Sequence, residues 1–186
     1  MCIRDRRGYD NEARHWLEAA LALPHSDAPT ALRADVLAAT GFMTYYRVDP
    51  ETALALLEES IAVHQILGNT RGLAQALLYL GHVYEEKDDY ARAGSLFEQS
   101  LTLCRDVGDT WYAAYALHSL ATVLWSQRNG EAARARWKEC IALYREIGDR
   151  WALSHPLNFL AGMMVTLGDY TQAMAFYQEC LAIAQE

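Results

Sequence analysis

Residues 68–107, GNTRGLAQALLYLGHVYEEKDDYARAGSLFEQSLTLCRDV, contain the pattern that determines the fold. The pattern returns at an offset of 40 residues along the whole chain. One alanine position occurs five times at this offset, and a large apolar residue follows four residues after each copy. The alanines are Ala13, Ala53, Ala93, Ala133 and Ala173, and the large residues are Leu17, Leu57, Phe97, Trp137 and Tyr177. Five concordant copies indicate a repeat architecture.

Within one period the apolar residues recur every four positions, which is the spacing of one face of an α-helix. We expect a first helix, helix A, at about 70–86, and a second, helix B, after the polar turn at 87–89. Gly68 can take the left-handed conformation that ends a helix, and Asn69 can cap the next one. A Gly-Asp pair at 108–109 and another at 148–149 predict the same boundary in the later periods.

The small residues of the two helices lead to a specific resemblance. Tetratricopeptide repeats carry a small residue in helix A, an aromatic residue three positions later, alanine at twelve and an aromatic residue at sixteen. Gly81, Tyr84, Ala93 and Phe97 match all four positions. Looser or partial matches are Gly41/Ala53/Leu57, Ala121/Ala133/Trp137 and Ala161/Ala173/Tyr177. The chain therefore resembles this family over about nine-tenths of its length, although its period is 40 residues and the common repeat has about 34. HEAT repeats share a longer period but lack this spacing of small and aromatic residues.

The resemblance implies an all-α, right-handed superhelical solenoid of about nine antiparallel helices. The expected divisions are helix B of a truncated repeat at 7–26, then repeats at 27–67, 68–107, 108–147 and 148–186. Residues 1–6 resemble the translation of a transposase adapter used in sequencing libraries, so we exclude them from the fold. Because neither end carries a polar capping repeat, we expect the chain to be a piece of a longer array.

Composition and charge restrict the class of partner. The net charge of -8 disfavours direct binding of nucleic acid, which needs a basic surface. The two longest uncharged runs, 110–127 and 151–168, contain polar residues in register with the repeat, so we interpret them as inner helices and expect no membrane span. Four cysteines without metal-ligand spacing, and the absence of a signal peptide, favour reduced thiols in the cytoplasm.

In the resembled family, helix A lines a concave groove and helix B forms the outer surface. Charge agrees with this assignment, because the helix B at about 131–146 is rich in Arg, Lys and Glu whereas 110–127 has no charged residue. The implied groove positions are Asp35, Phe42, Tyr45 and Tyr46, then Gln75, Tyr79, His82, Glu85 and Glu86, then Tyr115, His118, Ser119, Thr122 and Trp125, and finally His155, Asn158 and Phe159.

Such a surface suits a protein or peptide partner, or a small sugar-like effector. It lacks the Lys and Asn clamp by which chaperone-binding relatives hold an acidic tail. The same aromatic residues, at helical spacing, also suit packing in the core.

No catalytic or cofactor motif is present, so we expect a binding protein and no enzyme, cofactor or metal. His82, His118 and His155 lie on successive A helices, but no carboxylate or Cys spacing supports a metal site. Pro156 is the one local misfit, and we expect it to kink helix A or shift its start.

Three functions remain open. The 40-residue period with recurrent Gly-Asp turns resembles the repeat arrays of bacterial LuxR-type and other signal-transducing ATPase regulators. On that reading the array binds an inducer or a protein partner, and nucleotide and DNA binding occur elsewhere in the full protein. The alternatives are a stand-alone adaptor that assembles other proteins, and the repeat region of a kinase or nucleotide cyclase whose catalytic domain lies outside these residues.

Overall fold

The structure is a computed structural model, and it describes residues 12, 13, 15–17, 19–22, 28–45 and 49–185. All regular secondary structure among these residues is helical. The chain divides into two compact units, Met1–Leu103 and Cys104–Glu186, which are described separately. The predicted helix B at 7–26 lies partly outside the described residues, and the predicted groove residue Tyr46 lies wholly outside them.

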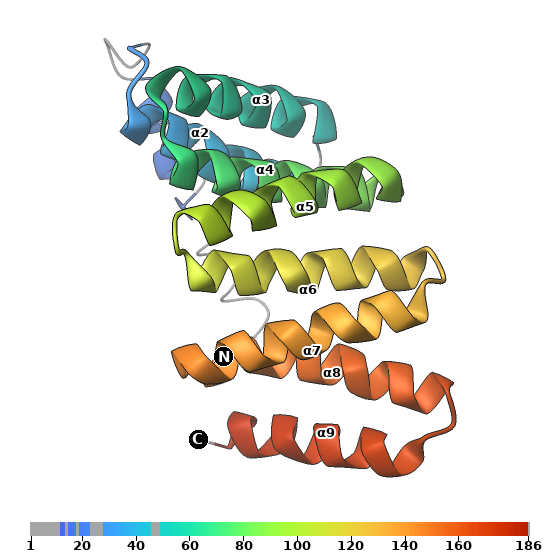
Figure 1. Cartoon of the computed structure of the whole chain (residues 1–186). Coiled ribbons are helices and arrows are strands. Elements are labelled where there is room, and N and C mark those ends of the chain that lie inside the picture. The colour runs from blue at the N-terminus through green and yellow to red at the C-terminus, as the bar shows by residue number, and fades with distance from the viewer. Residues whose placement is uncertain (1–11, 14, 18, 23–27, 46–48, 186) are drawn as a thin grey trace. The chain divides into compact units, whose positions relative to one another are not determined.

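The first unit is built from consecutive antiparallel helices (Figure 1). They are α2 (Ala31–Tyr45), α3 (Pro50–Leu67), α4 (Thr70–Glu86) and α5 (Tyr90–Asp106). The last three residues of α5 belong to the second unit. Helix α2 packs against both α3 and α4, and α3 packs against α4. The two A helices of this unit, α2 and α4, are therefore neighbours, with the B helix α3 against both of them.

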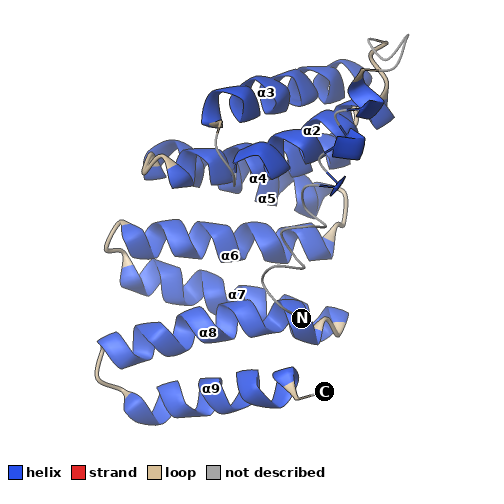
Figure 2. Cartoon of the chain, turned by 180° about the vertical axis from the view of Figure 1, so that it is seen from behind, coloured by secondary structure: helices blue, strands red, loops and turns tan. Residues whose placement is uncertain are grey.

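Within the second unit, two hairpins show the same pairing of antiparallel helices, seen from behind in Figure 2. Its helices are α6 (Thr110–Ser126), α7 (Gly130–Ile147), α8 (Arg150–Thr166) and α9 (Tyr170–Ala184). Each helix packs against the next along the chain. Helices α6 and α8 are of type A, and helices α7 and α9 are of type B.

The predicted helix boundaries are confirmed at the residues that cap them. The side chain of Asn69 accepts a hydrogen bond from the backbone N–H of Gly72, and that of Asp149 accepts one from Ala152. Gly68 ends α3 with a φ of 63°, and Gly148 ends α7 with a φ of 78°. Because the cap satisfies an N–H group that has no partner inside the helix, each Gly-Asn or Gly-Asp pair stops one helix and starts the next.

The turns from helix A to helix B contain a second left-handed position that the sequence analysis did not identify. Asp88 and Arg128 occupy it with φ of 58° and 66°, and Gly168 occupies it in the last hairpin with a φ of 79°. A residue with a Cβ is strained in this conformation, whereas glycine is not. Arg128 is therefore the least suited of the three residues to its turn.

The core of each unit depends on close contact between a small residue of helix A and a large residue of helix B. Phe97 and Trp137 are both completely buried. A Cβ placed on Gly81 would overlap the ring of Phe97, and one on Gly41 would lie 2.8 Å from Cγ of Leu57. In these two helix pairs of the first unit, the absence of a side chain in helix A is thus what allows the helices to approach this closely.

A small polar residue of helix B adds a hydrogen bond across the same helix pair. The hydroxyl of Ser60 donates to the carbonyl oxygen of Ala34 at 2.7 Å, and that of Ser100 donates to the carbonyl oxygen of Ala74 at 2.8 Å. In the last hairpin, Sγ of Cys180 lies 3.5 Å from the carbonyl oxygen of Ser154. These serine and cysteine positions therefore join the two helices of a hairpin as well as fill space between them.

Of the two effects predicted for Pro156, a kink or a shifted helix start, the shifted start is wrong. Helix α8 begins at Arg150 and is capped by Asp149 as the other A helices are capped, with Pro156 buried inside it. The cap fixes the first turn independently of a residue in the second turn, so the proline removes one N–H donor without moving the start.

Gly81→Ala should destabilise the chain by about 1–3 kcal/mol, because the new methyl group displaces the buried ring of Phe97. Gly162→Ala is the matched control, since the nearest atom to its added Cβ is the hydroxyl oxygen of Tyr177 at 3.9 Å. That change should stabilise helix α8 by about 1 kcal/mol through helix propensity. Urea unfolding followed by circular dichroism measures both, and equal effects would contradict the steric role of Gly81.

Arg128→Gly should raise the free energy of unfolding by about 1 kcal/mol, because glycine takes a positive φ without steric strain. Gln127→Gly provides the comparison, since residue 127 has an ordinary φ of -77° and gains nothing from glycine. The same unfolding measurement tests the pair. A loss of stability in Arg128→Gly would show that the arginine side chain outweighs the strain of its turn.

Candidate functional site

The A helices of the first unit bring four of the predicted groove residues together. The rings of Phe42 and Tyr79 stack with their centroids 4.3 Å apart, and Phe42 lies 6.2 Å from the ring of His82. The amide nitrogen of Gln75 donates to the hydroxyl oxygen of Tyr79 at 2.8 Å. These side chains are half-buried, so they pack against one another and still present part of their surface to solvent.

Acidic groups border this cluster. Nδ1 of His82 lies 3.0 Å from Oε2 of Glu85, and Glu86 at the end of α4 is exposed. Tyr45 is buried. Of the predicted positions in this unit, Tyr45 therefore contributes to packing, and the half-buried rings and the acidic groups remain accessible.

A connected row of aromatic rings crosses from α8 to α6 and α7 in the second unit. The rings of Trp151 and His155 are 4.8 Å apart, those of His155 and His118 6.4 Å, and those of His118 and Phe159 5.1 Å. Phe159 then approaches the buried Trp137 at 5.8 Å. Trp151 is 66% exposed and Phe159 40% exposed. The row is thus anchored in the core at one end and exposed at the other.

Two tryptophans at this surface were not among the predicted groove residues. The indole N–H of Trp111 donates to Oδ2 of Asp149 at 2.9 Å, and the Trp111 ring meets Tyr115 edge-on at 5.7 Å. Trp111 and Trp151 lie one period apart at the second position of helix A. That coincidence of two tryptophans at one repeat position is the signal by which the sequence could have identified them.

The remaining predicted residues of the second unit differ in exposure. Ser119 is buried and its hydroxyl donates to the carbonyl oxygen of Tyr115 at 3.2 Å. The hydroxyl of Thr122 donates to the carbonyl oxygen of His118 at 3.1 Å, and Trp125 is half-buried. Asn158 is exposed on α8 beside Phe159. The predicted groove positions of this unit that are exposed therefore lie on α8.

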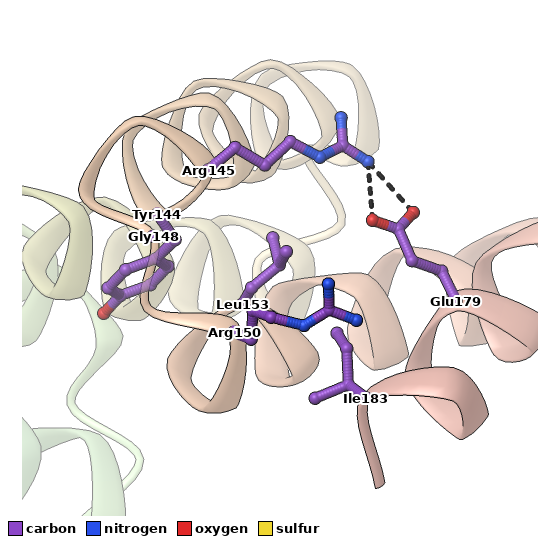
Figure 3. Close-up of a pocket in the computed structure, with 7 residues that line it drawn as sticks. All are labelled: Tyr144, Arg145, Gly148, Arg150, Leu153, Glu179 and Ile183. Carbon is purple, nitrogen blue, oxygen red and sulfur yellow. Dashed lines mark hydrogen bonds and ion pairs between the residues drawn. The ribbon is translucent and has the colours of Figure 1, made fainter. Parts of the chain in front are cut away.

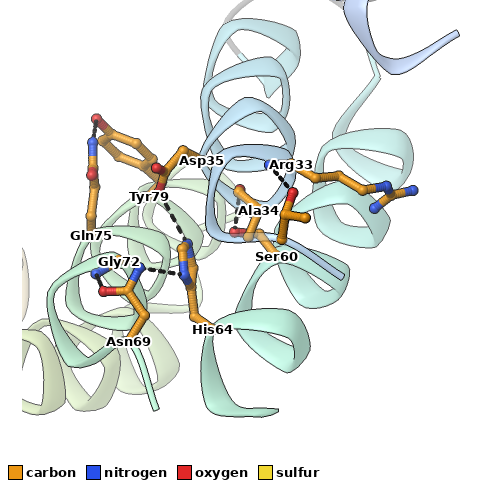
Figure 4. Close-up of polar contacts among 10 residues, drawn as sticks. Arg33, Ala34, Asp35, Ser60, His64, Asn69, Gly72, Gln75 and Tyr79 are labelled. Carbon is orange, nitrogen blue, oxygen red and sulfur yellow. Dashed lines mark hydrogen bonds and ion pairs between the residues drawn. The ribbon is translucent and has the colours of Figure 1, made fainter. Parts of the chain in front are cut away.

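A buried histidine connects three helices of the first unit (Figure 4). His64 lies in the last turn of α3 with its side chain fully buried, and Nε2 lies 3.3 Å from Oδ1 of Asp35 on α2. Nδ1 lies 3.1 Å from the amide nitrogen of Asn69, the residue that caps α4. A Cβ on Gly72 would overlap the imidazole ring, so this glycine leaves the space that the histidine fills. His64 therefore holds the start of α4 against α2.

In the described part of the second unit, two cavities of the same construction lie one period apart. The larger, about 440 Å³, lies near Gly148 between α7, α8 and α9, where Arg145 forms two 2.9 Å contacts with the carboxylate of Glu179 (Figure 3). The smaller, about 220 Å³, has Arg105 paired with Glu139 at the equivalent position. Because the lining positions are repeated, these cavities follow from the repeat geometry.

Among the described residues, no group of three or more His, Cys, Asp or Glu side chains is placed to hold a metal ion. Burial raises the pKa of the Cys140 thiol to about 12, with the charge of Glu139 acting in the same direction, so this thiol is a poor nucleophile at neutral pH. Within the same described part of the chain, every helix is too short or too polar to cross a membrane.

Lowering the pH should destabilise the fold through His64 and His155. Burial lowers the pKa of His64 from the ordinary value of 6.5, and partial desolvation lowers the pKa of His155, whose side chain stays exposed on α8. The nearby Asp35 and Asp149 oppose these shifts only in part. The unfolded chain therefore binds protons that the folded chain does not, and stability present above pH 6.5 is lost as the pH falls below it.

Urea unfolding at a series of pH values measures this loss. In His64→Gln with His155→Gln, the dependence of unfolding free energy on pH below neutrality should become shallower. An unchanged dependence in the double variant would assign it to other groups.

Comparison with known proteins agrees with this architecture. Residues 27–106 and 112–186 match the family described as Tetratricopeptide repeat. No curated protein sequence matches the chain significantly. The fold resembles BtubC (BKLC) from P. vanneervenii, with a TM-score of 0.77, 18% identity, and coverage of 100% of this chain and 75% of that one.

Two other solved structures are similar. MamA has a TM-score of 0.64 at 16% identity, and the match covers 100% of this chain and 96% of MamA. A Rap protein complexed with Competence and Sporulation Factor has a TM-score of 0.83 at 13% identity. That match covers 95% of this chain but 48% of the Rap protein. The all-α, tetratricopeptide-like fold predicted from the period is thus confirmed, and the chain belongs to the tetratricopeptide repeat family.

Proposed function

We propose that this chain is a protein-interaction module that binds a peptide segment of its partner along α6 and α8. The observation that carries the proposal is the connected row of rings from Trp151 to Phe159, which is exposed on α8 and anchored on the buried Trp137. Rings that are held by packing lose little conformational freedom when a partner covers them. Exposed aromatic side chains of this kind are typical centres of protein interfaces.

Charge supports a partner segment that is mainly apolar. Helix α6 has no charged side chain, and Arg150 at the first position of α8 is the one charged residue of that helix. A partner with an ionised group over the rings would lose solvation without gaining an opposite charge. The partner segment should therefore place aromatic or aliphatic side chains against the rings, and backbone or amide groups near His155 and Asn158.

The protein that contains this module is proposed to be a regulator. The resemblance of the 40-residue repeats to the arrays of bacterial signal-transducing ATPases supports this proposal. The similar Rap protein was solved with Competence and Sporulation Factor, which shows that a related fold can hold a bound factor. On this proposal the module works in the cytoplasm, and the nucleotide- and DNA-binding parts belong to the rest of the regulator.

Two other settings would use the same surface. A stand-alone adaptor would bind its partner without any attached domain, and a kinase or cyclase would carry the array beside its catalytic domain. The coding sequence on either side of this chain distinguishes the three, because a P-loop domain, a kinase or cyclase domain, or neither would adjoin the repeats.

Selection from a random-peptide library displayed on phage tests the proposed binding surface. Peptides selected on the chain should be rich in aromatic and aliphatic residues. When they are synthesised and measured by fluorescence anisotropy, Trp151→Ala with Phe159→Ala should weaken their binding by at least about tenfold. Both side chains are substantially exposed, so the helical circular dichroism should be unchanged.

Ile147→Ala is the matched control for this experiment. Ile147 at the end of α7 is 40% exposed, as Phe159 is, but it lies outside the row of rings. Selected peptides should bind this variant as they bind the unmodified chain. Equal loss of binding in both variants, or none in either, would contradict the proposed surface.

A further inference from the structure

The larger cavity of the second unit, between α7, α8 and α9, has the volume of a small-molecule site. At about 440 Å³ it falls within the range of pockets that hold small organic ligands. It is called the α7–α9 pocket below. Its lining includes Tyr144, Arg145, Arg150, Leu153, Glu179 and Ile183. None of these residues belongs to the row of rings on α8, so the pocket is a second surface, separate from the proposed peptide site.

The junction between two hairpins forms this kind of cavity also where further helices follow it. The cavity near Gly108 is lined by the equivalent positions one period earlier, and α8 and α9 both follow it in the chain. No residue of α8 lines that cavity, so a following helix leaves it open. The opening therefore belongs to the junction itself, and the side chains that line each cavity decide what it can bind.

Two lining positions differ between the cavities in a way that changes their chemistry. Thr110 and Ala113 of the smaller cavity are replaced one period later by Arg150 and Leu153. The arginine–glutamate ion pair is present in both. Asp109 also lines the smaller cavity. The α7–α9 pocket therefore gains a positive charge and a larger apolar wall relative to its neighbour.

The charged groups that line the pocket, two arginines and one glutamate, leave an excess of positive charge. Both carboxylate oxygens of Glu179 lie 2.9 Å from Nη2 of Arg145, so these two charges offset each other. Burial raises the pKa of Tyr144, so its phenol stays uncharged. Arg150 supplies the excess charge, and in Figure 3 its side chain extends from α8 toward Ile183. Because a guanidinium has five N–H donors, Arg150 can hold two carboxylate oxygens alongside its other contacts.

Apolar side chains form much of the remaining wall. Leu153 and Tyr144 are buried and Ile183 is half-buried, so packing already fixes their positions. A hydrocarbon group placed against them would leave water at little cost in conformational freedom. A ligand with two negative charges would keep one of them uncompensated in the pocket, which costs solvation. The lining therefore suits one negative charge attached to an apolar body.

We propose that the α7–α9 pocket binds a small monocarboxylate, whose carboxylate is held by Arg150 and whose hydrocarbon body packs against Leu153 and Ile183. The ligand contacts α8 and α9 together, so it stabilises the last hairpin by binding only the folded chain. The net charge of the chain is -8, so a positive pocket is the place where an anion gains from approaching it. The inference does not depend on peptide binding at the row of rings.

Titration of phenylacetate and of hexanoate into the isotope-labelled chain, followed by the NMR signals of backbone amides, tests the proposal. The signals of Gly148, Leu153 and Ile183 should shift and saturate, with a dissociation constant of about 1 mM or below for ligands of this size. The signal of Gly108, at the equivalent position of the smaller cavity, should not move. Phenylacetamide and hexanamide have the same bodies without the charge and should give no saturating shift.

Arg150→Thr should weaken the binding of both acids by at least about tenfold, because it removes a charge-assisted hydrogen bond. Threonine is the residue at the equivalent position 110, so the variant should fold. Lys138→Gln is the matched control, since it removes one positive charge from an exposed position of α7 outside the pocket. Both it and Trp151→Ala with Phe159→Ala should bind the acids as the unmodified chain does.

Four results would overturn the proposal. They are the absence of a saturating shift with either acid, binding of the amides as tight as that of the acids, a shift of Gly108 that accompanies that of Gly148, and unchanged binding in Arg150→Thr. Inorganic phosphate serves as the comparison anion. If it bound as tightly as the acids, the pocket would be a site for anions in general, and the role given to the apolar wall would be wrong.

Discussion

The close approach of helix A to helix B, made possible where helix A lacks a side chain, is the constraint on which the rest of this structure depends. Gly81 leaves the space that the ring of Phe97 fills, and Gly41 does the same for Leu57. A large buried residue on helix B then reaches beyond its own hairpin, as Trp137 does when it meets Phe159 of α8. The same position is Ala121 and Ala161 in the later repeats, so a small residue recurs on helix A every 40 residues opposite the large residue of helix B.

This packing also limits what the A helices can offer to a partner. Helices α6 and α8 are buried on the sides that face the B helices, so only a narrow part of each remains accessible. On α8 that part carries Trp151, His155 and Phe159, whereas on α6 several predicted groove side chains bond to their own helix or are half-buried. The rings are positioned by the same core contacts that hold the repeats together, so the proposed binding surface and the core meet at Phe159 and Trp137.

The two ends of a period are fixed by different physical means. A glycine with positive φ followed by Asn or Asp ends helix B and caps helix A, and this pairing is visible in the sequence. The turn from helix A to helix B needs a left-handed residue as well, but Asp88 and Arg128 occupy it without the usual glycine. A similar conflict between local preference and packing occurs at Pro156, which a helix interior tolerates because Asp149 and the surrounding core already fix the helix.

The sequence by itself determined the period, the helix pairs, the caps and the repeat family, because these depend on residues that are close in the chain or recur in register. It also predicted which helices lack charge. Only the tertiary structure decided which aromatic residues are exposed. Trp137 and Tyr177 occupy the same repeat position, yet the first is completely buried and the second is 41% exposed. The reason is that a side chain in a stack is buried by the neighbouring helix, so its exposure depends on what packs beside it and not on its own repeat alone.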